Sequence, residues 1–145
     1  MKRTLLLGVY LFSLVFTGCL SSNPSSSSLA YVMINGATPE AIQKTAIEVF
    51  QDEYYNVAEQ TATELVFERA ATEQDRARWG RYGEQGMRMR VVVVIETFPN
   101  GDISVRADAY ILRERGVADV EAITPLGRRP YMKLLKEVRK KTTKS

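Results

Sequence analysis

Residues 87–113 read MRMRVVVVIETFPNGDISVRADAYILR, and this stretch decides the class of fold. Two runs rich in β-branched residues, 87–98 and 103–113, are joined by Pro-Asn-Gly-Asp at 99–102. Asn-Gly between such runs is the strongest short-range signal for a β-hairpin. The second run alternates, and its apolar face holds Ile103, Val105, Ala107, Ala109 and Ile111. The stretch predicts two long antiparallel strands with one packed face and one largely solvated face.

A helix is expected on each side of these strands along the chain. Thr-Pro-Glu at 38–40 is a helix start, in which Thr caps, Pro takes the first helical position and Glu favours the positive end of the dipole. Apolar residues at helical spacing then predict amphipathic helices over 39–53 and 129–141. They are Ile42, Ala46, Val49 and Phe50 in the first, and Tyr131, Leu134, Leu135 and Val138 in the second.

The remaining segments complete the expected fold. Runs at 55–60 and 65–69 predict a short hairpin, and AYVMI at 30–34 is either an edge strand or an extended lead-in. Segments 70–86 and 115–127 read as loops. Because the strands run together and do not alternate with helices, the class is α+β. We expect a two-layer sandwich, with a four-stranded antiparallel sheet flanked by an N-terminal and a C-terminal helix.

The first 19 residues have the layout of a secretory signal. Lys2 and Arg3 precede an apolar run of 12 residues at 5–16, which ends in the small residues Thr-Gly-Cys. A membrane-spanning helix needs about 20 apolar residues, so a permanent transmembrane anchor is the weaker interpretation.

Phe-Thr-Gly-Cys at 16–19 resembles the lipobox of bacterial lipoproteins. The resemblance implies that 1–18 is a signal peptide, that Cys19 carries the lipid, and that acyl chains hold the protein on a membrane. Cys19 is the only cysteine in the chain. The alternatives are a plain secretory signal, or a buried cysteine acting as a small hydrophobe. Leu20 after the cysteine is compatible with export to the outer membrane in a double-membraned bacterium.

A Ser-rich tether follows and leads into one domain. Residues 20–28 read LSSNPSSSS, a flexible linker with a reach of about 15 to 20 Å. Residues 19–28 are therefore expected to be the lipidated cysteine and its tether, and 29–145 the α+β domain. This order of elements behind a lipobox is similar to small domains of bacterial lipoproteins such as the C component of the outer-membrane β-barrel assembly machinery. The likeness covers element order and carries no function.

Composition argues against most catalytic chemistry. The 145 residues contain no His and one Cys, which removes the commonest metal ligand and general base. We expect no metal, no cofactor and no enzymatic activity. Several carboxylates could supply a glycosidase-like pair, but no spacing selects one. They are Glu68, Glu73, Asp75, Glu96 and Asp108.

The loop 70–86 holds the candidate binding residues. Arginines and aromatics interleave there, as interface hot spots require, and Arg side chains could also hold an anionic glycan or lipid head group. The candidates are Trp79, Arg76, Arg78, Arg81 and Tyr82. The alternative is that Trp79 caps one end of the core while the arginines extend along the surface.

Charge is distributed unevenly along the chain. Residues 19–127 hold 10 basic and 16 acidic side chains, a net of −6, whereas 128–145 hold 8 basic and one acidic, a net of +7. Arg139, Lys140, Lys141 and Lys144 could touch anionic lipid head groups, or they could simply complement the dipole at a helix C-terminus. Nucleic acid is not an expected partner in an exported compartment.

Together these patterns predict a lipid-anchored protein of the bacterial cell envelope, with its domain in the periplasm or extracytoplasmic space. The expected function is a protein-interaction or structural module with an envelope protein as partner. The alternative is a carrier or sensor of a lipid or cell-wall fragment.

Overall fold

The computed structural model describes residues 28–82, 85–115 and 117–144. The predicted signal peptide, Cys19 and the tether up to residue 27 lie outside the described residues. The elements in chain order are β1 (Ala30–Ile34), α1 (Pro39–Asp52), β2 (Asn56–Gln60), β3 (Glu64–Ala70), α2 (Glu73–Trp79), β4 (Arg88–Thr97), β5 (Ile103–Arg115), β6 (Val117–Ala122), the 3-10 helix η1 (Pro125–Gly127) and α3 (Arg129–Thr142).

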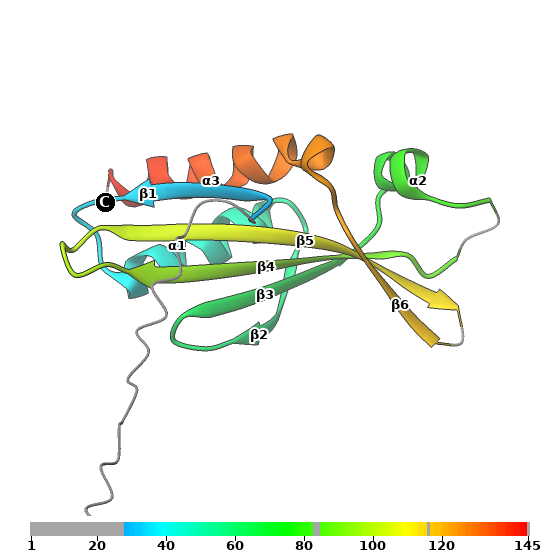
Figure 1. Cartoon of the computed structure of the whole chain (residues 1–145), viewed down its shortest axis with the longest axis horizontal. Helices are drawn as coiled ribbons and strands as arrows, with labels where there is room; N and C mark the ends of the chain where they lie inside the picture. Colours follow the sequence, from blue (N-terminus) through cyan, green and yellow to red (C-terminus); the bar gives the residue numbers. More distant parts are fainter. Residues whose placement is uncertain (1–27, 83–84, 116, 145) are drawn as a thin grey trace, which may run out of the picture.

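One antiparallel sheet organises the domain, in the order β1-β5-β4-β3-β2, with β6 also paired to β5. Strand β5 is 13 residues long, and along one of its edges it pairs with two strands, one after the other. Its first part pairs with β1, from Ile103 opposite Ile34 to Ala107 opposite Ala30. Its last part pairs with β6, from Tyr110 opposite Ala122 onward. Strands β1 and β6 therefore follow one another along the same edge of β5 (Figure 1).

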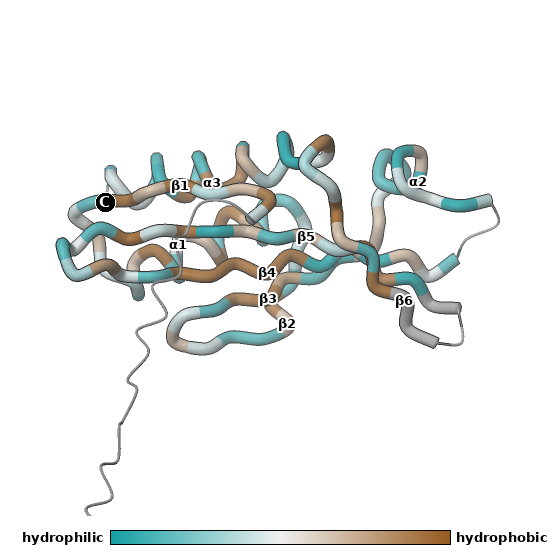
Figure 2. Tube along the Cα trace, viewed as in Figure 1, coloured by the Kyte–Doolittle hydropathy of each residue, from teal (hydrophilic) through white to brown (hydrophobic). Residues whose placement is uncertain are grey.

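Helices α1 and α3 pack against each other and against the sheet, and they close the main core. Thr38 caps α1 by accepting a hydrogen bond from the Ala41 amide, and Pro39 opens the helix, as the sequence predicts. The apolar stripes of both helices are buried. Figure 2 shows apolar residues concentrated along β4, the central strand, while hydrophilic residues recur along α3. No helix in the described part of the chain is both long and apolar enough to cross a bilayer.

The structure confirms the α+β class and the antiparallel sheet. The prediction of four strands is wrong, because the sheet has six. AYVMI at 30–34 is a paired strand and not a lead-in. Segment 115–127, expected to be a loop, contains β6 and η1. The reason is the length of β5, which extends beyond the end of β1 and leaves backbone groups that a further strand can pair.

The second face of the sheet is less solvated than its charge suggests. Cross-strand ion pairs cover it, including Arg90 Nε to Glu68 Oε1 at 2.6 Å and Arg106 Nη2 to Glu96 Oε2 at 3.2 Å. Opposite charges on facing strands stabilise a sheet modestly. Ser104 and Leu112 on this face are buried, which corrects the expectation of a largely solvated face.

Arg113 is a charged residue on the packed face of β5. Its side chain is only 2% exposed. Its Nη2 donates to the carbonyl oxygen of Trp79 and to Glu121 Oε2, both at 2.9 Å. One guanidinium thus joins β5, the end of α2 and β6.

We predict that Arg113→Met destabilises the domain by about 1–3 kcal/mol, because it removes a buried guanidinium and leaves the Trp79 carbonyl oxygen without this donor. Arg90→Met on the more exposed face should cost less than about 1 kcal/mol, since surface ion pairs contribute little. Urea denaturation of both variants measures this difference. Equal losses would contradict a special role for Arg113.

Candidate functional site

Segment 70–86, expected to be a loop, contains the short helix α2. A capping box starts it: Thr72 Oγ1 accepts from the Asp75 amide at 3.1 Å, and Asp75 Oδ2 accepts from the Thr72 amide at 2.9 Å. This reciprocal pair satisfies two backbone donors that a helix start otherwise leaves open. The helix holds Arg76, Arg78 and Trp79 in fixed directions.

Trp79 attaches α2 to the segment before α3. The Trp79 ring is half-buried against the core. A Cβ at Gly127 would lie 2.8 Å from Trp79 Cζ2 and 2.5 Å from Ile123 Cγ2, so only glycine fits beneath the ring. Arg78 Nη2 donates to the Leu126 carbonyl oxygen at 3.2 Å. These contacts hold α2 over η1 at a fixed distance from α3.

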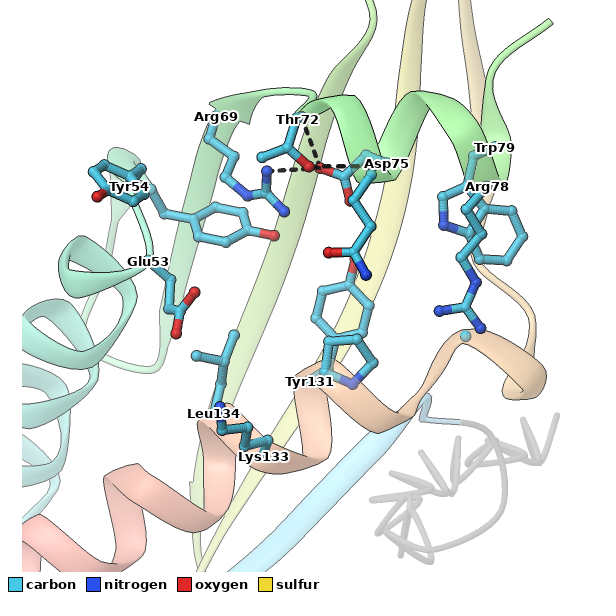
Figure 3. Close-up of a pocket in the computed structure, with 14 residues that line it drawn as sticks. Glu53, Tyr54, Arg69, Thr72, Asp75, Arg78, Trp79, Tyr131, Lys133 and Leu134 are labelled. Carbon is cyan, nitrogen blue, oxygen red and sulfur yellow. Dashed lines mark hydrogen bonds and ion pairs between the residues drawn. The ribbon is translucent and has the colours of Figure 1, made fainter.

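A pocket of about 310 Å³ lies between the end of α1, α2 and the start of α3 (Figure 3). Its walls combine aromatic rings with groups that can form hydrogen bonds. The aromatic residues are Tyr54, Tyr55, Trp79 and Tyr131. The polar residues are Glu53, Arg69, Thr72, Gln74, Asp75, Arg78 and Lys133. Such a mixture in one concavity is typical of ligand sites.

Arg69 and Asp75 form a polar network on one wall of the pocket. Arg69 Nη1 donates to Asp75 Oδ2 at 2.6 Å, and Thr72 Oγ1 lies 2.8 Å from the same oxygen. The Arg69 guanidinium carbon also lies 4.7 Å from the centre of the Tyr55 ring, a cation–π contact. Arg69 Nε is buried and has no hydrogen-bond partner within the described part of the chain.

The network fixes the charge states of its members. Burial on its own raises the pKa of Asp75, but hydrogen bonds from Thr72 and Arg69 outweigh it and hold this pKa below its ordinary 3.8. Burial lowers the pKa of Arg69, but the contacts with Tyr55 and Asp75 raise this pKa by more than burial lowers it. The net shift of the Arg69 pKa is therefore upward.

Burial is also the main reason why the pKa values of Tyr55 and Tyr131 are raised. At neutral pH the pocket therefore presents an ion pair and two neutral hydroxyls.

Tyr54 lies at the rim of the pocket in an unusual conformation. Its φ is +64°, in the left-handed region that favours glycine. It directly follows the C-cap of α1, and its amide donates to the Gln51 carbonyl oxygen at 2.9 Å. Its side chain is 84% exposed. A tyrosine that occupies a glycine-type position and offers its ring to solvent is a candidate contact for a ligand.

The five predicted binding residues do not gather at one site. Arg78 and Trp79 line the pocket. Arg76 lies outside it and donates to the Ala71 carbonyl oxygen at 2.8 Å, and Arg81 pairs with Glu121 at 3.3 Å. Tyr82 is fully exposed outside the pocket.

The sequence reasoning did not identify Tyr55, Arg69 or Tyr131 as site residues. The Thr72–Asp75 capping pattern was the available signal that a helix starts in this segment. Within the described residues, no group of three or more His, Cys, Asp or Glu side chains could hold a metal ion.

The lowered pKa of Asp75 predicts a dependence of stability on pH. A carboxyl whose pKa is lower in the folded state stabilises the fold above its unfolded pKa, and this contribution disappears as pH falls through the folded pKa. At pH 7, Asp75→Asn should therefore cost about 1–3 kcal/mol through weakened hydrogen bonds. The difference from wild type should shrink below about pH 4.

Denaturant titrations from pH 7 to pH 2 measure this effect, and Glu48→Gln, an exposed carboxylate on α1, is the control. A cost of Asp75→Asn that stays constant over this range would show that the charged network does not form.

Known protein sequences assign no family to this chain. No protein-family model matches the chain. No curated protein matches it either. What the pocket binds has to be argued from the side chains that line it.

Proposed function

We propose that this chain is an exported bacterial lipoprotein, anchored through Cys19, whose domain carries or senses a fragment of the cell wall. The pocket between α1, α2 and α3 supports this proposal most directly, because it joins four aromatic residues to a set of polar groups. The lipobox-like sequence at 16–19 supports a location in the envelope, where the ligand would be met.

Aromatic rings favour a sugar as the ligand. Pyranose rings have flat faces of C–H groups that pack against aromatic rings, and Tyr and Trp also offer polar edges. The pocket volume of about 310 Å³ suits one or two such rings and not a long acyl chain. This favours a wall fragment over a lipid.

The polar groups fit the hydroxyls, amides and carboxylates of such a fragment. Glu53 and Gln74 offer acceptors, and Gln74 and Arg78 offer donors around the opening. Asp75 is already engaged by Arg69 and Thr72, so it positions Arg69 and is not available as an acid or base. We propose binding without catalysis.

A protein-interaction module is the second candidate function. Tyr82 is fully exposed after the end of α2, and Arg76 and Arg81 are also exposed in this segment. These residues form a surface outside the pocket that an envelope protein could contact.

Lipid attachment is tested by metabolic labelling with radioactive palmitate in a bacterial host. Wild-type protein should incorporate the label and fractionate with membranes. Cys19→Ser should lose both properties, because the thiol that receives the lipid is gone. Labelling that persists in Cys19→Ser would overturn the anchor.

Ligand binding is tested through the fluorescence of Trp79, the only tryptophan in the chain. A soluble muropeptide should change its emission in a saturable way. Tyr54→Ala and Gln74→Ala should weaken binding about three- to tenfold each, through lost packing and lost hydrogen bonds.

The matched controls are Tyr82→Ala and Gln51→Ala, which remove an exposed tyrosine and an exposed helical glutamine outside the pocket. They should leave the affinity unchanged. Capture of an envelope protein that Tyr82→Ala abolishes, together with no muropeptide response, would favour the second candidate.

A further inference from the structure

One face of α3 carries a row of four cations. Arg129, Lys133, Lys136 and Lys140 are spaced at i, i+4, i+7 and i+11, so they share one side of the helix. All four are exposed, and they lie opposite the buried stripe of α3. At 1.5 Å per residue the row is about 16 Å long. We call these four residues the cationic row.

Most of the charge in this row is not neutralised by the protein. Arg129, Lys133 and Lys136 have no ion-pair partner within the described part of the chain. Lys140 has an i,i+3 contact with Glu137 at 3.5 Å. Exposed pairs of this kind contribute little. The row therefore presents nearly its full positive charge to whatever faces it.

The helix dipole explains only part of this arrangement. Cations stabilise the C-terminal turn of a helix, which accounts for Lys140 and its neighbours. At the other end, Arg128 and Arg129 stand at the positive N-terminus, and the first turn has no acidic residue. Cations there oppose the dipole and lower the stability of the helix. An external anionic partner would offset this cost.

The neighbouring helix has the opposite charge. The outward side of α1 carries Glu40 and Glu48, with Lys44 between them, and Asp52 at its end pairs with Lys141 of α3 at 3.1 Å. The two helices cover different parts of the sheet, since α3 packs on β1 and β5 while α1 packs on β2 and β4. Figure 1 shows α3 running along the β1 edge of the domain. Of these two helices, α3 thus carries the positive charge, and it does so at that edge.

We propose that the cationic row rests on an anionic phospholipid bilayer and orients the domain with its β1 edge toward the membrane. The tether at 20–28 joins the domain just before β1, the strand against which α3 packs. Nine residues separate the proposed anchor at Cys19 from Leu29, too few for the β1 edge to lie far from the bilayer. The same orientation holds the acidic side of α1 farther from the lipid head groups. This inference rests on the lipid anchor proposed above, but the contact itself does not require acylation.

Vesicle binding of the unacylated chain tests the contact separately from the anchor. The protein is residues 19–145 with Cys19→Ser, which contains every described element of the fold, and circular dichroism confirms folding of each variant. Co-sedimentation with vesicles of phosphatidylcholine plus phosphatidylglycerol is compared with vesicles of phosphatidylcholine alone. Binding should require the anionic lipid and weaken as salt is raised.

Substitutions locate the contact on the helix. Lys136→Gln should lower the partition coefficient about fivefold, and Lys136→Gln with Lys140→Gln about twentyfold, as expected for charges that each face an anionic surface. Lys44→Gln is the matched control, because it removes one exposed lysine from the outward side of α1 and changes net charge equally. It should bind as the unsubstituted chain does.

Three results would overturn the proposal. They are absence of binding to anionic vesicles at low salt, equal binding to neutral vesicles, and an equal loss for Lys44→Gln and Lys136→Gln. In the first case, retention on immobilised heparin would assign the row to an anionic polysaccharide. The outcome of the palmitate experiment does not depend on vesicle binding, so failure of the anchor and failure of the contact are distinguishable.

Discussion

The domain depends on the length of β5. At 13 residues it pairs with β4 on one side, and on the other it is long enough for β1 and then β6. Backbone N–H and C=O groups in a sheet need partners, so a strand that extends past β1 requires another strand beside its final residues. Strand β6 meets that need. After β6 the chain continues through η1 into α3, and the position of α3 follows from the end of β5.

The pocket follows from the same geometry. Three attachments hold α2 above α3: the Arg113 guanidinium bonded to the Trp79 carbonyl oxygen, the Trp79 ring on Gly127, and Arg78 on the Leu126 carbonyl oxygen. Each attachment joins α2 to β5 or to the segment between β6 and α3. None of these contacts involves the Arg69–Asp75 ion pair, although Arg78 and Trp79 also line the pocket.

Much of the fold could be predicted from the sequence, because α1, α3, β4 and β5 carry strong periodic patterns. Helix α2 could not be predicted from periodicity, since seven residues with no buried side chain form no apolar stripe. Strand β6 reads VADVEA, too short and too polar to stand out. Alternation along β5 places Arg113 on the core side, but only the fold shows that its partner is Glu121. The neighbours of Tyr131 are likewise known only from the fold, so its helical spacing predicted a core residue and not a pocket residue.

The edge of the sheet formed by β2 affects what happens when neighbouring molecules meet. Among the described residues no strand pairs with the outer side of β2, and such edges can join the sheets of neighbouring molecules. Its sequence, NVAEQ, is polar and mostly exposed, and its register shifts between Val57 and Glu59. Charge, polarity and a bulge all disfavour strand addition. Copies at high local concentration meet edge to edge more often than dilute copies do, and the features of β2 disfavour the joining of their sheets into continuous ones.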